Sequence, residues 1–278
     1  YLSPGSRPHL FFRSNILTMG RLFRIVRLLI LMIYFCPHMF WRGPKKSDKD
    51  RMNFVARRQK IGCQHIVKSL GITTEVIGQI PNDKAVLVAS NHIGVFDSLI
   101  LASNMDVAFV AKAEMGTWPI MGWVFRVVGI IFAHRKNVMK TAQTIEEIRT
   151  RMRSGVAVMV FPEGTTSDGT QLLPFKTGVF EAISHMSDGF VVPVYFHVRT
   201  MGGEKVDAET RKLVTWFAPQ NMRSNLWQVL GLGPLHFAIR IGDPISSDGK
   251  NRKELAAESQ VAVQVLKSAE EKSLGLSS

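Results

Sequence analysis

The sequence predicts an α/β fold, with a mostly parallel sheet flanked by helices. After Gly71, short apolar runs rich in β-branched residues alternate with longer stretches of helical periodicity, the pattern of strands joined by crossover helices. Residues 156–161 form a continuous apolar run, as expected of a strand buried on both faces of a parallel sheet. The chain has 278 residues, 46% of them hydrophobic, which is enough to bury one sizeable core.

Before this domain lies a charged segment, residues 45–68, whose apolar residues are at helical spacing. We expect an amphipathic helix that pairs with an apolar helix before it; an ordinary surface helix is the alternative. Strands are expected over residues 72–77, 85–89, 107–111, 129–133, 156–161, 190–196 and 235–241. Helices are expected over residues 97–104, 137–153, 177–185 and 251–274.

The positive charge is concentrated at the amino-terminal end. Of the net charge of +13, residues 1–70 supply nearly all, with fourteen Lys or Arg against Asp48 and Asp50. Basic residues beside an apolar helix attract anionic lipid headgroups by roughly 1 kcal/mol each. Because no zinc finger or aromatic–basic RNA motif accompanies the charge, we expect anionic membrane lipids as partners and no nucleic acid.

The apolar stretch of this segment is short for a membrane span. Its uninterrupted core is residues 28–36, and extension to residues 22–41 brings in Arg24 and Arg27. A full span needs about 20 mostly apolar residues. A helix dipping into one leaflet and a single span therefore both remain open, and we expect membrane association on the cytoplasmic face. Residues 1–70 are the predicted two-helix membrane-associating segment, and residues 71–278 the α/β domain.

A histidine and an aspartate follow the expected strand 85–89, in the run Asn91-His92-Ile93-Gly94-Val95-Phe96-Asp97. On one straight helix these two side chains would point about 140° apart. They meet if His92 lies in the loop and Asp97 in the first helical turn. The carboxylate then holds one imidazole N–H and leaves the other nitrogen basic. Taken alone, such a pair is also common without any function.

Two further groups follow neighbouring strands. Phe161-Pro162-Glu163-Gly164-Thr165 is a turn at a strand's carboxyl end, where α/β sheets bind ligands, although an ordinary turn has the same composition. Arg135 follows Gly129-Ile130-Ile131-Phe132-Ala133-His134, and Lys112 ends another strand. A guanidinium and an ammonium there suit a phosphate, but each is equally compatible with a solvated surface charge.

Taken in order, the motifs Asn-His-x4-Asp, Gly-x2-Phe-x2-Arg, Phe-Pro-Glu-Gly-Thr and Val191-Val192-Pro193-Val194 resemble those of the glycerolipid acyltransferase family. Its best-known members are 1-acylglycerol-3-phosphate acyltransferases, and the resemblance covers roughly residues 72–245. It implies that His92 is the general base, oriented by Asp97. It also implies that Arg135 and Lys112 contact the acceptor phosphate, and that Glu163, Gly164 and Thr165 shape the acceptor pocket.

The resemblance implies a membrane-associated enzyme that moves a fatty acyl group from acyl-CoA or acyl carrier protein to a lysophospholipid hydroxyl. The first expected acceptor is 1-acylglycerol-3-phosphate, giving phosphatidic acid. Many phosphatidate-forming members have arginine after Glu-Gly-Thr, whereas this chain has Thr166. Lyso-ornithine lipid or another lysolipid is therefore the alternative acceptor. Lys176 is a candidate for compensating charge, but we expect it to be an ordinary exposed lysine.

Direct transfer is the expected mechanism. The sequence has no Gly-x-Ser-x-Gly motif, and its two cysteines, Cys36 and Cys63, lie in the amino-terminal segment. No cofactor is expected beyond the acyl donor, and no metal, because His92, Asp97 and Glu163 lack a recognised metal-ligand spacing. A lipid esterase that uses water as acceptor and a non-catalytic membrane adaptor remain as alternatives.

Overall fold

The computed structural model describes residues 21–30, 47–81, 84–134 and 138–275. Residues 21–30 form a helix. The remaining helices are α2 (Asp48–Ser69), α3 (Asp97–Asn104), η1 (Ala113–Thr117), α4 (Met121–Val127), α5 (Val138–Arg153), η2 (Thr177–Ala182), α6 (Ala208–Arg211), α7 (Met222–Val229) and α8 (Arg252–Ser273). The strands are β1 (Ile72–Ile77), β2 (Ala85–Ser90), β3 (Val107–Lys112), β4 (Ile131–Ala133), β5 (Ala157–Val160), β6 (Gly189–Met201), β7 (Glu204–Lys205), β8 (Leu235–Ile241) and β9 (Ile245–Ser246).

The strands form one mixed sheet in the order β1-β8-β6-β2-β5-β3-β4. Neighbouring strands from β6 to β4 are parallel, so the predicted mostly parallel α/β fold is confirmed. The sheet turns antiparallel at β8, which pairs with β6 in the opposite direction, and the short β7 and β9 also run antiparallel to β6. The hydrophobic runs alone did not indicate this change of direction.

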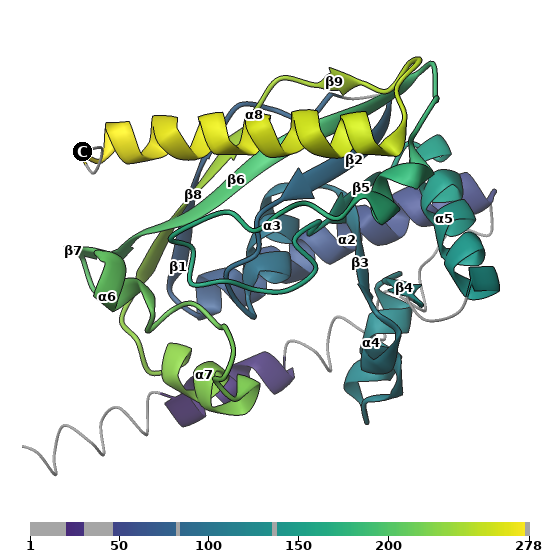
Figure 1. The fold of residues 1–278 in the computed structure, drawn as a ribbon. Helices are drawn as coiled ribbons and strands as arrows, with labels where there is room; N and C mark the ends of the chain where they lie inside the picture. The colour runs from purple at the N-terminus through teal and green to yellow at the C-terminus, as the bar shows by residue number, and fades with distance from the viewer. Residues whose placement is uncertain (1–20, 31–46, 82–83, 135–137, 276–278) are drawn as a thin grey trace, which may run out of the picture.

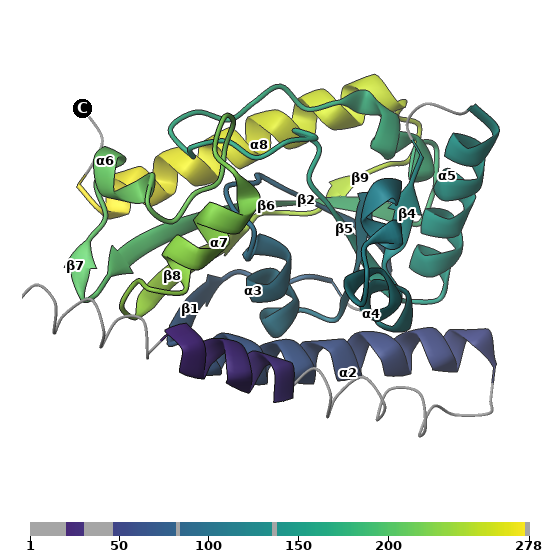
Figure 2. The same ribbon diagram turned by 90° about the horizontal axis from the view of Figure 1, so that it is seen from below.

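Side chains of β6 alternate between two apolar cores, one on each face of the sheet. Val192, Val194 and Phe196 pack on the face covered by α2 and α3. Val191 and Tyr195 pack on the face covered by α5, η2 and α8. Figure 2 shows α2 on one side of the sheet and α5 and α8 on the other. The domain is thus a three-layer arrangement in which the strand ends remain at the open edges of the sheet.

Helix α2 belongs to the core of the domain, because Cys63, Val67 and Leu70 are buried with residues of α3 and the sheet. The helix of residues 21–30 lies against the turn after α7, where Arg24 donates hydrogen bonds to the carbonyls of Leu230 and Leu232, each at 2.8 Å. Among the described helices, none is both long and apolar enough to cross a bilayer. Part of the apolar stretch, residues 31–41, lies outside the described residues.

One side of the helix of residues 21–30 carries an exposed apolar stripe. The four later residues of this stripe lie one, four, seven and eight positions after its first residue, Leu22, and this spacing places all five on one face of the helix. The stripe consists of Leu22, Phe23, Val26, Leu29 and Ile30, each between 46% and 66% exposed. The opposite side carries Ile25 and Leu28, which pack against the domain. An apolar face is therefore presented outward.

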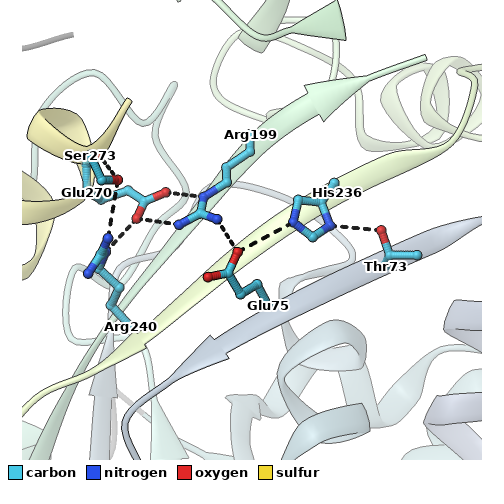
Figure 3. A network of polar contacts seen from close by, with 7 residues as sticks. All are labelled: Thr73, Glu75, Arg199, His236, Arg240, Glu270 and Ser273. Atoms are coloured by element: carbon cyan, nitrogen blue, oxygen red, sulfur yellow. Dashed lines mark hydrogen bonds and ion pairs between the residues drawn. The ribbon is translucent and has the colours of Figure 1, made fainter. Parts of the chain in front are cut away.

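Helix α8 is fastened to the sheet by a polar network (Figure 3). The fully buried carboxylate of Glu270 accepts hydrogen bonds from Arg199 Nε and Arg240 Nε, each at 2.5 Å, and Arg240 also reaches Ser273. Arg199 also contacts Glu75 of β1. Three strands and one helix therefore share one ion-pair network at this end of the domain.

Two sequence expectations need correction. Residues 177–185 were expected to form a helix, but the structure has only a short 3₁₀ helix, η2, over Thr177–Ala182. The strand expected over residues 190–196 extends further, from Gly189 to Met201. The extension, residues 197–201, mixes apolar and polar residues that pair with β8 and with the short hairpin strand β7.

Candidate active site

The sequence motifs converge because the strands before them are neighbours. Strands β2, β5, β3 and β4 lie side by side in that order and are parallel. Their carboxyl ends therefore meet at one edge of the sheet. His92 follows β2, the Glu163 turn follows β5, Lys112 ends β3, and His134 follows β4. Four segments that are far apart in the sequence thus lie at one edge of the sheet.

His92 and Asp97 meet at the start of this edge. His92 lies in the loop after β2 and Asp97 is the first residue of α3. The imidazole Nδ1 is 2.7 Å from Asp97 Oδ2, and the same oxygen accepts the backbone N–H groups of Ile93 and Gly94 at 2.6 and 2.9 Å. Because an ionised carboxylate can only accept, Nδ1 carries the proton and Nε2 is left as the basic nitrogen.

The side chains of His92 and Asp97 differ in their exposure to solvent. The Asp97 side chain is 3% exposed, whereas that of His92 is 23% exposed. The imidazole stacks on Phe161, with ring centroids 4.0 Å apart and planes inclined by 13°. The aspartate is therefore a buried anchor, and the histidine is held between two fixed contacts while one part of it reaches solvent.

Neighbouring segments brace the His92 loop through the backbone. Asn91 is 2% exposed, and its side-chain amide accepts from Phe196 N at 2.7 Å and donates to Phe196 O at 3.0 Å. Trp216 N donates to Ile93 O at 2.8 Å, and Ser167 N donates to His92 O at 2.9 Å. The loop is therefore held from β6, from the turn after β5 and from the segment after α6.

Glu163 ties the His92 loop to the chain that follows β5. It is 2% exposed and accepts backbone hydrogen bonds from His92 N and Leu173 N, each at 3.2 Å. Burial raises the pKa of Glu163 to about 7; the two backbone donors oppose the rise and the nearby Asp97 adds to it. Its carboxylate points inward, so Glu163 acts on the site through the backbone of its neighbours.

A cation lies over the same turn. Gly164 has a φ of +72°, and a Cβ there would come within 2.7 Å of Lys176 Nζ. Thr165 is exposed, whereas the next residue, Thr166, is only 8% exposed. Glycine at this position therefore allows the turn to bend and the Lys176 side chain to lie across it. The ammonium is placed beside the turn that carries a neutral Thr166.

Comparisons with known proteins show which family this chain belongs to. The family profile named Acyltransferase matches residues 71–197. The chain is 31% identical over 204 residues to the lyso-ornithine lipid O-acyltransferase of Rhodobacter capsulatus, covering 72% of each chain. The chain belongs to the acyltransferase family. It is also 31% identical over 194 residues to the Rhizobium meliloti enzyme of the same name, covering 67% of this chain and 66% of that relative.

A solved structure shares the acyltransferase fold. The crystal structure of the 1-acyl-sn-glycerophosphate acyltransferase PlsC from Thermotoga maritima matches with a TM-score of 0.64 and 20% identity, covering 92% of this chain and 98% of that one. The match supports the arrangement of sheet and helices described above. This acyltransferase therefore presents its His92–Asp97 pair on a known scaffold.

The remaining residues expected to bind the acceptor lie at the same edge, as far as they are described. Lys112 is the exposed last residue of β3, and its register partner in β4 is Ala133, one residue before His134. Arg135 lies outside the described residues. Among the residues that are described, no group of three or more His, Cys, Asp or Glu side chains is arranged to hold a metal ion.

Several supporting residues of this acyltransferase were missed from the sequence. Asn91 belongs to the first motif, but its bridge to Phe196 depends on a strand more than 100 residues away. Trp216 and Leu173 act through backbone N–H groups, which no side-chain pattern reveals. Cys63 is buried, and burial raises the pKa of its thiol to about 12, so it is no nucleophile at neutral pH.

Proposed function

We propose that this chain is a lysolipid O-acyltransferase in which His92 is the general base. The observation that carries the proposal is the contact of 2.7 Å between His92 Nδ1 and a buried Asp97 carboxylate that also accepts two backbone N–H groups. This arrangement fixes the ring and leaves Nε2 as the proton acceptor. The family membership supplies the reaction class, acyl transfer.

In the proposed reaction, Nε2 of His92 takes the proton of the acceptor hydroxyl while the oxygen attacks the thioester carbonyl. The tetrahedral intermediate then collapses, the carbon–sulfur bond breaks, and the imidazolium returns its proton to the departing sulfur. The products are an ester and a free thiol. General-base assistance of this kind contributes roughly 10²- to 10⁴-fold to the rate. The donor is an acyl thioester, either acyl-CoA or acyl carrier protein, and no further cofactor takes part.

The proposed acceptor is lyso-ornithine lipid. Both relatives described above carry that name, and the position after Glu163-Gly164-Thr165 holds a buried, neutral Thr166. The cation left beside the turn, Lys176, suits a carboxylate such as that of an ornithine headgroup. A single ammonium is a weaker match for the higher charge of a phosphate monoester.

The second candidate acceptor is 1-acylglycerol-3-phosphate. Lys112, the exposed last residue of β3, supplies a further cation at this edge of the sheet, and the resemblance to the family adds Arg135, which lies outside the described residues. A competition experiment with both acceptors at equal concentration separates the two candidates. A product dominated by phosphatidic acid would reject the first acceptor and leave acyl transfer intact.

The site is proposed to work at a membrane surface. The exposed apolar stripe of residues 22–30 lies beside Arg27, and the first 70 residues carry a charge balance of +12. An apolar stripe flanked by basic residues binds the interface of an anionic bilayer. A monotopic arrangement on the cytoplasmic face fits an acceptor that resides in that leaflet.

The decisive experiment offers the purified chain a panel of lysolipids with acyl-CoA and with acyl carrier protein, and follows ester formation. His92→Ala is expected to lower kcat/KM by about 10³-fold or more, because the proton acceptor is lost. His65→Ala, which removes an exposed histidine of α2, is the matched control. Substantial turnover by the His92→Ala variant would reject the proposed base, and release of free fatty acid without an acceptor would indicate an esterase.

A further inference from the structure

The connection between β3 and β4 is an apolar hairpin built from η1 and α4. Residues 118–128 contain a single charged residue, Arg126, and no acidic residue. Three large side chains at its end are exposed: Trp118 at 37%, Ile120 at 77% and Trp123 at 49%. We call these three residues the Trp tip. Such a cluster on a soluble surface marks a surface that contacts something else.

The hairpin is rigid, so the Trp tip has no route back into the core. The backbones of η1 and α4 touch so closely that a Cβ on Gly122 would come within 2.2 Å of Gly116 O. Arg126 Nη2 also donates to Gly116 O at 2.8 Å. On the other side, a Cβ on Gly116 would lie 3.1 Å from the Phe132 ring of β4. Two glycines and one arginine thus fix the hairpin against the sheet.

Ile120 has a backbone conformation that favours glycine. Its φ is +63°, a region that β-branched residues avoid because Cβ clashes with the backbone. A smaller or more flexible residue would relieve this strain, and a polar one would suit its 77% exposure. Neither the fold nor contact with water accounts for isoleucine at this point. A binding partner that buries the side chain does.

The hairpin that carries the Trp tip is joined at both ends to strands that end at the proposed acceptor site. It begins directly after Lys112 and leads into β4, which ends one residue before His134. At the start of α5, Val138 and Met139 are 88% and 76% exposed, and Thr141 Oγ1 ties that turn to His134 O at 2.6 Å. Figure 1 places α4 and the helix of residues 21–30 at the same lower side of the molecule, and in Figure 2, seen from below, both lie toward the viewer.

We propose that the Trp tip is a second membrane contact, which inserts into the interface of an anionic bilayer and brings the acceptor site down to the lipid headgroups. The proposal rests on the proposed function, because an acceptor held in a membrane must reach His92 from that surface. Tryptophan is favoured at the headgroup level, where its ring is apolar and its N–H remains wet. Residues 118–128, which carry the Trp tip, contain no acidic side chain to repel anionic lipid.

An anionic bilayer fits the Trp tip better than a second copy of the chain. Each copy carries a net charge of +13, so two copies repel each other, whereas anionic lipid attracts both. The tip also has only three large exposed side chains, fewer than the roughly 20–30 residues on each side of a typical stable protein interface.

The test uses the full chain with Trp118→Ser, Ile120→Ser and Trp123→Ser combined. The matched control is Val261→Ser with Val265→Ser, which removes two side chains of α8 that are 65% and 63% exposed. Flotation with phosphatidylcholine vesicles containing phosphatidylglycerol measures binding. Activity is measured with a lysolipid in those vesicles and with a short-chain, monomeric lysolipid. Circular dichroism and thermal melting check that each variant folds.

We expect the tip variant to bind the vesicles about tenfold more weakly or worse, and its ratio of vesicle to monomer activity to fall by a similar factor. The control variant should keep both values. Unchanged vesicle binding in a folded tip variant would overturn the proposal, as would a loss of self-association in place of vesicle binding. If the wild-type chain binds through the tip but acylates no lysolipid, the proposed function fails and the membrane contact stands.

Discussion

At the scale of single residues, Asp97 has two tasks that one oxygen performs together. Oδ2 orients the imidazole of His92 and also closes the turn by accepting Ile93 N and Gly94 N. Asp97→Asn is expected to lower kcat by about 10³- to 10⁴-fold, because an amide NH₂ facing Nδ1 favours the wrong tautomer. Steady-state kinetics will measure the loss. Asp106→Asn, at an exposed position before β3, is expected to change kcat by less than about twofold.

Glu163 is expected to affect both rate and stability. In Glu163→Gln one of the two N–H groups, of His92 or of Leu173, loses its acceptor. Leaving one buried donor unpaired costs about 1–3 kcal/mol, so we expect kcat/KM to fall about tenfold or more. Glu204→Gln, on the exposed β7, provides a control that should keep the wild-type rate.

The contribution of the Glu163 carboxyl to stability depends on pH with a definite sign. Its pKa of about 7 in the folded protein lies above the ordinary 4.5, so the folded state binds the proton more tightly than the unfolded state. Its contribution to the free energy of unfolding is therefore present below pH 4.5 and is lost as the pH rises through 7, by about 3 kcal/mol in total. Urea unfolding of Glu163→Gln across this range should show a shallower decline than the wild type. An identical decline would contradict the raised pKa.

The residues of the site divide into those that the sequence can indicate and those that it cannot. His92 and Asp97 are only five residues apart, so loop geometry allowed their contact, and the resemblance to the family motifs made that contact the expectation. The inward direction of Glu163 depends on Leu173 and on the His92 loop, which meet only after β2 and β5 have paired. The position of Lys176 over Gly164 likewise depends on the path of the chain after Thr166.

At the scale of elements, the attachment of α8 depends on Glu270. Burial alone would raise the pKa of this carboxyl, but hydrogen bonds and charge from Arg199 and Arg240 outweigh it and lower the pKa below its ordinary value. Stability from this group is therefore present above about pH 4.5 and is lost as the pH falls through the lowered pKa. Glu270→Gln is expected to cost about 3 kcal/mol at neutral pH, because Arg240 loses its counter-charge and Arg199 keeps only the partly exposed Glu75.

The matched control for α8 is Glu258→Gln. Glu258 forms an ion pair with Lys250, and its side chain is 44% exposed, so its loss should cost about 0.5 kcal/mol. Thermal and urea unfolding at pH 7 will compare the two variants. If they lose the same stability, the network in Figure 3 contributes no more than an exposed pair.

Elements were predictable where the pattern was long and local. Helix α3 and strands β1 and β8 have the expected bounds. The antiparallel direction of β8 relative to β6 was not predicted, because a buried apolar run has the same composition whichever way the strand runs. The α4 hairpin was also missed: its apolar residues suggest a core segment, and only the close approach of Gly116 and Gly122 turns them outward.

At the scale of the whole molecule, charge and apolar surface are expected to bind lipid independently. Arg27→Gln removes one exposed charge beside the stripe and should weaken binding to anionic vesicles about fivefold at low salt. That effect should vanish at about 1 M salt, where the screening length is about 3 Å instead of about 10 Å at 0.1 M. The loss caused by the three substitutions in the Trp tip should persist at both salt concentrations, because burial of apolar surface is not screened. If that loss also disappeared in high salt, burial of the apolar side chains of the tip would not account for it, and insertion of the tip into the bilayer would be refuted.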